Sequence, residues 1–111
     1  MKTENHEVIF AIVNAGFADE AMAVAREQGA RGGTILGARG VAREQEAAFF
    51  GITIHPEKEI LMLVVEKDVR NRILNALYTQ MGMDKKAQGI VFSLPVSDAA
   101  GLLPLSETKA E

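Results

Sequence analysis

The sequence predicts an α+β fold in which two helices pack on one face of an antiparallel sheet. Four apolar runs typical of strands alternate with two segments of helical periodicity, in the order β-α-β, loop, β-α-β. The 111 residues, 48% of them apolar, suffice for one domain with its own core. This order is that of a ferredoxin-like βαββαβ domain.

The first half of the chain supplies a strand, a helix and a second strand. Residues 7–14 form a continuous apolar run with β-branched side chains, which predicts a buried strand. Residues 17–28 place apolar side chains at helical spacing, and Gly29 is suited to end the helix that they predict. Residues 31–39 predict a short second strand bounded by glycines.

The second half begins with a polar stretch. Residues 40–48 suit a short helix and a mobile loop equally well, and residues 52–54 form a short extended piece. The run 59–65 is the most strand-like of the chain. Residues 57–59 are expected to form a solvated start to that strand.

A second helix is predicted to begin near Asp68, whose carboxylate can cap it. One face of this helix has apolar residues at every fourth position: Val69, Ile73, Leu77 and Met81. Gly82 ends the helix, residues 83–88 form a basic turn, and residues 89–96 predict the last strand.

One domain is expected over residues 1–104, with a disordered tail over 105–111. The strands at 7–14 and 59–65 are apolar on both faces, whereas one layer of helices covers a single face. Burial of apolar surface contributes about 25 cal/mol per Å², so an exposed apolar sheet face predicts self-association. We therefore expect a homo-oligomer built on contacts between sheet faces.

Charge and composition argue against several classes of function. The formal net charge is −3, whereas a nucleic-acid-binding surface normally shows a basic excess. The chain has no cysteine, which excludes disulfides, thiolate metal sites and a cysteine nucleophile. The first residues lack the apolar core of a signal peptide, and no apolar run approaches the roughly 20 residues of a membrane-spanning helix. We expect a cytoplasmic protein that neither binds nucleic acid nor inserts into a membrane.

The segment 30–43 has the pattern best suited to a ligand. Four glycines lie in it: Gly32, Gly33, Gly37 and Gly40. Because glycine weakens a strand, they serve either bulges and turns or the close approach of a ligand to the backbone. Arg39 and Arg43 are either solvated charges or two cationic forks suited to a phosphate.

Three further groups have more than one interpretation. Lys85 and Lys86 form a polar turn or contact a phosphate. The adjacent aromatic residues Phe49 and Phe50 pack on the domain or a neighbouring subunit, or they dock a partner protein. His6 and His55 are far apart in the sequence and lack metal-ligand spacing, so structural or surface roles are expected.

Several motifs between about residues 7 and 96 resemble, in order and spacing, the nitrogen regulatory protein P-II family of signalling proteins. Gly33-Thr34-Ile35 after the first helix resembles the start of the family's second strand. The segment 40–45, Gly-Val-Ala-Arg-Glu-Gln, resembles the base of the family's long T-loop. Residues 56–60 resemble the return into the third strand, and residues 89–96 resemble the fourth strand after the B-loop.

The resemblance implies a homotrimer that binds an adenine nucleotide in clefts between subunits. The effector would be ATP, ADP or AMP, with or without Mg²⁺. The protein would regulate a partner, such as a membrane transporter, through its T-loop. The ligand-binding residues so implied are Thr34, Gly37, Arg39, Gly40, Arg43, Lys85, Lys86, Gln88 and Gly89. The partner-docking loop would present Arg43, Glu44, Phe49 and Phe50. No covalent chemistry is required, so neither enzyme activity nor a metal site is expected.

The chain also departs from the family's pattern. The segment between Gly40 and Ile60 is shorter than the usual T-loop, and the single tyrosine, Tyr78, lies in the second helix. Uridylylation of the T-loop is therefore not expected. Ile90 replaces a lysine after the B-loop glycine, and the arginine pair near the C-terminus is missing. Since each charge-assisted hydrogen bond contributes about 1.5–3 kcal/mol, a less charged nucleotide or a different small ligand becomes a candidate.

Two other functions are compatible with the same fold. A ferredoxin-like acyl-phosphate hydrolase would use an arginine, Arg31 or Arg39, together with an asparagine, Asn14 or Asn75. A trimeric metal-tolerance protein is the second alternative. The absence of cysteine and the scattered histidines weigh against it.

Overall fold

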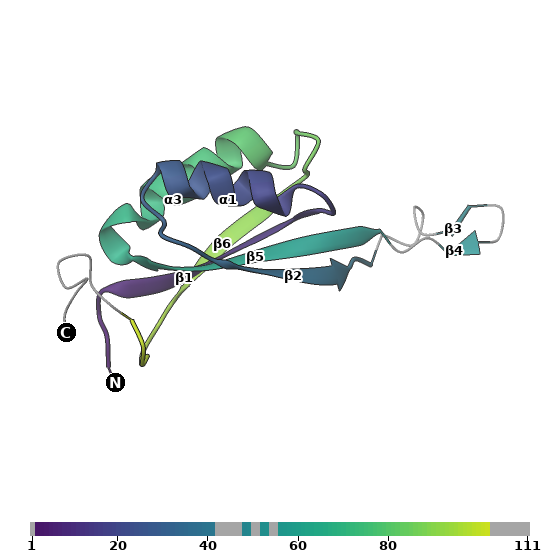
Figure 1. Cartoon of the computed structure of the whole chain (residues 1–111). Coiled ribbons are helices and arrows are strands. Elements are labelled where there is room, and N and C mark those ends of the chain that lie inside the picture. Colours follow the sequence, from purple (N-terminus) through teal and green to yellow (C-terminus); the bar gives the residue numbers. More distant parts are fainter. Residues whose placement is uncertain (1, 42–47, 50–51, 54–55, 103–111) are drawn as a thin grey trace.

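The computed structural model describes residues 2–41, 48–49, 52–53 and 56–102 (Figure 1). Within these residues the elements are β1 (His6–Asn14), α1 (Ala18–Glu27), β2 (Thr34–Arg39), β3 (Ala48–Phe49), β4 (Ile52–Thr53), β5 (Glu57–Glu66), α3 (Lys67–Met81) and β6 (Ile90–Pro95). Strands β2, β5, β1 and β6 form one antiparallel sheet in that order, and β3 pairs separately with β4. The predicted ferredoxin-like order is confirmed.

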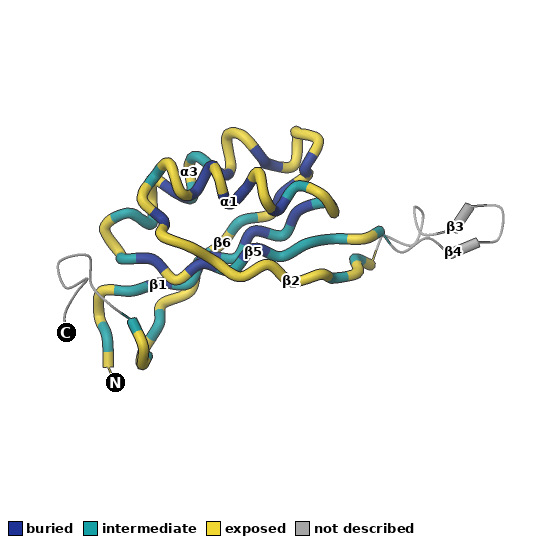
Figure 2. The backbone as a smooth tube through the Cα atoms, viewed as in Figure 1, coloured by how far each residue is buried: buried dark blue, intermediate teal, exposed yellow. Residues whose placement is uncertain are grey.

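Helices α1 and α3 lie side by side on one face of the sheet, and the core fills the space between the two layers (Figures 1 and 2). Strand side chains alternate between the two faces, so every second residue of β1 and β5 points to the helices. The buried strand residues on this side are Ile9, Ala11, Val13, Leu61, Leu63 and Val65. The helices contribute mainly Ala21, Val24, Ala25, Ile73, Leu77 and Met81.

The four-residue periodicity of α3 is confirmed, but its predicted cap is wrong. Ile73, Leu77 and Met81 are buried, and Val69 packs against the core. Strand β5 runs directly into the helix, with Glu66 at the N-cap position and no side-chain capping bond. Asp68 therefore lies inside the first turn, where its charge still suits the positive end of the helix dipole.

Helix α1 ends as the sequence predicts, at a glycine. Gln28 is the C-cap, and Gly29 follows with a φ of +115°, which only glycine adopts without strain. The N–H of Ala30 donates to the carbonyl of Ala25 at 3.1 Å. The chain thus turns back toward the sheet before β2 begins.

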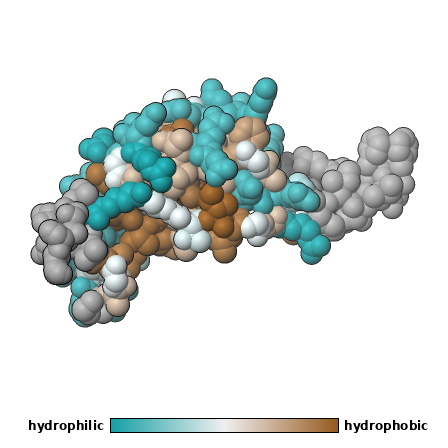
Figure 3. Space-filling model, in the orientation of Figure 1, coloured by the Kyte–Doolittle hydropathy of each residue, from teal (hydrophilic) through white to brown (hydrophobic). Residues whose placement is uncertain are grey.

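The second face of the sheet has no helix over it. The register pairs Leu36 with Ile60, and it stacks Phe10 on Phe92 with ring centroids 5.4 Å apart. We call this side the open face; its apolar residues are Val8, Phe10, Ile12, Leu36, Ile60, Met62, Val64, Ile90, Phe92 and Leu94. Ile90 and Leu94 are about half exposed, at 53% and 50%. Figure 3 shows hydrophobic side chains gathered along the sheet below the more polar helices.

An ion pair links β1 to α3. Arg70 Nη1 lies 2.8 Å from Glu7 Oε1, and the side chain of Glu7 is only 7% exposed. Burial of an unpaired carboxylate is unfavourable, so this contact orients α3 against the sheet.

Several predicted features lie outside the described residues. These are Arg43, Glu44, Phe50, His55 and the tail 105–111, together with most of the segment predicted to be a helix or a loop. Phe49 is described only as a backbone position in β3.

Candidate ligand-binding site

Most of the predicted ligand-binding residues meet at one end of the sheet. Strand β2 ends there at Arg39, β1 ends at Asn14, and β5 and β6 begin there at Glu57 and Ile90. The turn 82–89 leads into β6 at this same end. We call it the loop end, because the segment 42–55 leaves and returns beside it.

A backbone hydrogen bond closes the base of that segment. The N–H of Gly40 donates to the carbonyl of Pro56 at 2.7 Å. A Cβ added to Gly40 would lie 3.2 Å from Lys58 Cε and 3.3 Å from Lys58 Cγ. The backbone of Gly40 therefore rests on the stem of Lys58.

The turn 82–89 is held by its own backbone. The N–H of Lys85 donates to Gly82, that of Gln88 to Lys85 at 3.0 Å, and that of Gly89 to Met81 at 2.7 Å. A Cβ on Gly89 would overlap the Met81 carbonyl oxygen, so glycine is required there by the fold itself. The side chains of Lys85 and Lys86 are exposed, and they add positive charge to this end.

Asn14 joins the turn to β5. Its Nδ2 donates to the carbonyl of Lys86 at 2.9 Å and approaches Gln88 Oε1 at 3.5 Å. Its Oδ1 accepts a bond of 2.8 Å from Lys58 Nζ. Its backbone N–H donates to Ala87 at 2.8 Å. One residue thus binds both sides of the loop end.

Lys58 is a half-buried cation that no carboxylate neutralises within the described part of the chain. Adjacent residues of a strand point to opposite faces, so the neighbouring carboxylate of Glu59 turns to the helix side. There its Oε1 accepts bonds from the N–H groups of Gly16 and Ala18, each 3.0 Å long, at the start of α1. The expectation of a solvated strand start is therefore wrong for Lys58 and Glu59, because both side chains are engaged.

The glycines of the segment 30–43 divide into two classes. A Cβ on Gly33 would lie 2.6 Å from Leu63 Cδ2 and 3.0 Å from the Met62 carbonyl oxygen, so Gly33 serves the packing of the chain on β5. A Cβ on Gly32 or Gly37 would meet nothing within 4 Å, and neither residue has a positive φ. Nothing in the described structure thus demands glycine at position 37, which leaves free space above the backbone of β2.

The predicted residues do not all share one place within a single chain. Gly37 and Arg39 lie on the helix side of β2, whereas Lys58 and Asn14 lie on the open face. The β2 group and the turn 82–89 are separated by two intervening strands, or roughly 14 Å. Thr34 lies five residues before Arg39, which is roughly 16 Å along the strand.

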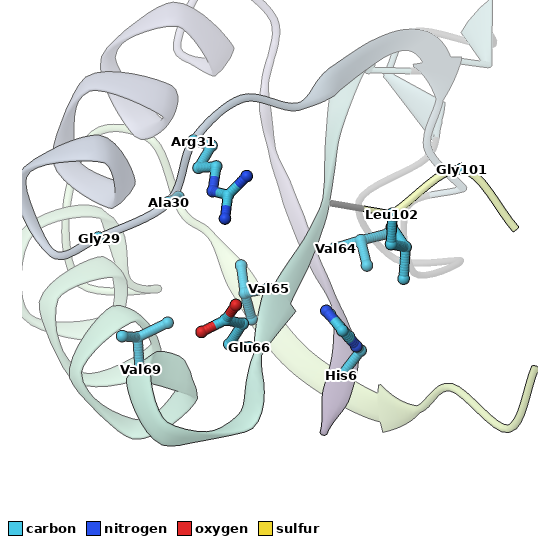
Figure 4. Close-up of a pocket in the computed structure, with 10 residues that line it drawn as sticks. All are labelled: His6, Gly29, Ala30, Arg31, Val64, Val65, Glu66, Val69, Gly101 and Leu102. Carbon is cyan, nitrogen blue, oxygen red and sulfur yellow. The ribbon is translucent and has the colours of Figure 1, made fainter. Parts of the chain in front are cut away.

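A cavity of about 290 Å³ lies at the opposite end of the sheet (Figure 4). It borders the last residues of β5, the start of α3 and the connection between α1 and β2. Its polar lining residues include His6, Arg31 and Glu66, and its apolar ones include Val64, Val65 and Val69. Figure 4 shows the Arg31 guanidinium extending into the space beside Glu66. The sequence pattern did not point to this cavity, because its lining comes from separate segments.

The candidates for other functions are dispersed. Asn14 and Arg39 share the loop end, but Asn14 uses its amide to hold Lys58 and the turn. Arg31 lies at the cavity, and Asn75 is exposed on α3. His6 Nδ1 is 2.8 Å from the hydroxyl of Thr3, and the described residues contain no group of three or more potential metal ligands. Among the described helices, none is long and apolar enough to cross a membrane.

Neither a family model nor a curated protein matches the sequence, but solved structures match the fold. The PII protein of Arabidopsis thaliana, in a structure bound to citrate, aligns with a TM-score of 0.60 and 22% identity; the match covers 84% of this chain and 78% of that one. CutA from Synechococcus elongatus PCC7942 aligns with a TM-score of 0.66 and 11% identity, over 87% of this chain and 81% of that one. At these identities the matches establish the fold, which is the ferredoxin-like fold of PII and CutA.

Proposed function

We propose that this chain is a homotrimeric, PII-like regulator that binds an adenine nucleotide between subunits and signals through the segment 42–55. One observation carries the proposal: the base of that segment and the turn 82–89 are joined through Lys58 and Asn14 at the loop end of the sheet. A ligand that binds the turn would thus lie next to the segment that reports it.

The open face supports self-association. Its apolar side chains form a continuous surface over four strands, and several are between two fifths and a half exposed. A surface of this kind is typical of an interface between subunits. Contacts between open faces would bury it and bring the ends of neighbouring sheets together.

Two subunits would complete each ligand site. Because Thr34 lies on the open face and Arg39 on the helix side, roughly 16 Å apart along β2, one small ligand does not contact both residues in the same chain. The cavity beside Arg31 lies toward the Thr34 end of β2. We propose that the loop end of one subunit faces the cavity end of its neighbour, with Thr34 contributed by the second chain.

In such a cleft different residues would contact different parts of the nucleotide. Lys58, Lys85 and Lys86 would attract the phosphates, and Arg39 with the free space above Gly37, roughly 14 Å away on the helix side of β2, would meet a different part of the ligand. The apolar wall formed by Val65 and Val69 would accept a base. Because Ile90 stands where the family has a lysine after the B-loop glycine, ADP or AMP becomes a better fit than ATP.

The ligand would act through differential affinity for two arrangements of the segment 42–55. The residues proposed to meet the partner are Arg43, Glu44, Phe49 and Phe50. The partner itself, for which a membrane transporter is the family's example, is proposed by analogy of fold.

Calorimetric titration of the purified protein with ATP, ADP and AMP, with and without Mg²⁺, tests the proposal. Saturation near one site per subunit, in a protein whose mass in solution is that of a trimer, is the expected result. Citrate should be titrated in parallel, because the Arabidopsis PII structure contains it. A folded oligomer that binds none of the three nucleotides would contradict the proposed ligand.

Mixed oligomers test whether the cleft is shared. One variant has the turn lysines reversed, Lys85→Glu with Lys86→Glu, and the other has Arg31→Glu. Each alone should lose binding. When the two are co-assembled at random, about a quarter of the interfaces should combine two unaltered halves and recover binding. No recovery in verified mixed trimers would place the ligand within one subunit.

A further inference from the structure

We infer that Asn14 is a positioning residue, which holds the Lys58 ammonium in place and couples the conformation of the turn 82–89 to the base of the segment 42–55. This inference deepens the proposed function and rests on it for the ligand. The mechanical link itself belongs to the described fold and is testable without any ligand.

The first step is that the donor and the acceptor of one side-chain amide bind different partners. An asparagine side chain has two N–H donors and one carbonyl acceptor. In Asn14 the Nδ2 group is directed at the turn, to Lys86 and Gln88, and the Oδ1 atom is used for Lys58. No other natural side chain of this length can donate to one side and accept from the other in this way.

The second step leads from Lys58 to the segment base. Gly40 packs against the aliphatic stem of Lys58. A Cβ added to Gly40 would lie 3.2 Å from Lys58 Cε and 3.3 Å from Lys58 Cγ. Gly40 in turn holds Pro56 through the 2.7 Å backbone bond that closes the base. A displacement of Lys58 therefore shifts or releases the contact between Gly40 and Pro56.

The third step is the competition that a ligand would introduce. Lys58 Nζ has three donors, and in this structure one of them is given to a neutral amide oxygen. An anion adds the attraction of a full opposite charge, which the neutral amide oxygen of Asn14 lacks. An anionic group bound at the turn would thus draw Lys58 from Asn14 and alter the support beneath Gly40.

Site-resolved amide hydrogen exchange on the ligand-free protein tests the link. The Gln88 N–H reports the turn and the Gly40 N–H reports the base. Lys58→Met keeps the apolar stem and removes the ammonium. It should accelerate exchange at Gln88, on the far side of Asn14, by at least about threefold. Lys85→Met, the matched control, removes an exposed charge at the same end and should leave the exchange of both Gln88 and Gly40 unchanged.

Two Asn14 variants separate coupling from a general structural role. Asn14→Ala should accelerate exchange at both amides, and Lys58→Met added to it should then have no further effect on Gln88. Asn14→Asp keeps an acceptor for Lys58 but loses both donors to the turn, so Gly40 should stay protected while Gln88 does not. Equal loss at both amides in Asn14→Asp, or fully additive effects of Asn14→Ala and Lys58→Met, would overturn the inference.

A nucleotide arm connects the link to the ligand. Saturating ADP should change the exchange of Gly40 in the wild type and leave it unchanged in Asn14→Ala, even where ADP still binds. If Gly40 responds equally in both proteins, the inference is wrong. If the wild type binds no adenine nucleotide, the proposed function fails by itself, and the ligand-free comparison alone decides the inference.

Discussion

Gly37→Ala distinguishes whether glycine at this position of β2 is required for stability or for ligand binding. A Cβ at this position meets no atom within 4 Å, and the φ of Gly37 is not positive. Alanine can therefore adopt the same backbone without strain. The variant should be at least as stable as the wild type, while the added methyl group occupies the space through which a ligand would approach.

The magnitude follows from the unfolded state. A glycine replaced by alanine at a compatible position stabilises a protein by about 0.4–1 kcal/mol, because the unfolded chain loses freedom. For a domain near 100 residues, 1 kcal/mol raises Tm by about 4–8 °C, so a rise of a few degrees is expected. If the methyl group excludes a ligand from the backbone, affinity should fall at least about tenfold, which corresponds to 1.4 kcal/mol.

Gly89→Ala is the matched comparison, since glycine at position 89 is required by the fold. The new Cβ would overlap the carbonyl oxygen of Met81, which also accepts the N–H of Gly89. Overpacking of this kind costs about 1–3 kcal/mol. Gly89→Ala should therefore lower stability, in contrast to Gly37→Ala.

Thermal unfolding and calorimetric titration with ADP measure the two effects in the same preparations. A lower Tm for Gly37→Ala would refute the conclusion that the space above β2 is free. An unchanged ADP affinity, in a wild type that binds ADP, would remove Gly37 from the ligand site. Equal losses of stability in both variants would mean that the two glycines serve the same purpose.

Three further substitutions test the oligomer and the core. Phe92→Glu places a charge on the open face and should convert the oligomer to a folded monomer by light scattering, whereas Tyr78→Glu, on a residue 72% exposed on α3, should not; a persisting Phe92→Glu oligomer would exclude this face as the interface. Arg70→Ala leaves the buried Glu7 carboxylate unpaired and should lower the free energy of unfolding in urea by about 3 kcal/mol, with partial recovery on adding Glu7→Gln. Leu77→Ala empties a fully buried site and should lower the free energy of unfolding by about 2–5 kcal/mol; a loss below about 1 kcal/mol would contradict its burial.

The fold could be predicted because local sequence patterns, such as the spacing of apolar residues and the position of glycines, determine its helices and strands. The spacing of Ile73, Leu77 and Met81 places them on one face of a helix whatever the rest of the chain does. Gly29 ends α1 through its own backbone freedom. The predicted N-cap of α3 is wrong for an equally local reason. Strand β5 passes directly into the helix at Glu66, so no turn precedes the helix in which Asp68 could act as the N-cap.

The site could be predicted only in part. Glycines and lysines mark the turn and the base of the segment 42–55, but Asn14 and Lys58 are 44 positions apart in the sequence. Their contact depends on the register of two strands, which local propensity does not specify. The cavity beside Arg31 escaped prediction for the same reason, since four separate segments must come together to form it.

The alternation of Lys58 and Glu59 has a consequence for the assembly of the sheet. A slip of β5 by one residue would direct the Lys58 ammonium at the N-terminus of α1, where the helix dipole is positive, and would remove the carboxylate that receives the N–H groups of Gly16 and Ala18. The same slip would turn Leu61 toward the open face. Two adjacent residues of opposite charge thus favour one register of β5. Sheets in the wrong register are disfavoured by these charges as well as by the loss of apolar burial in the core.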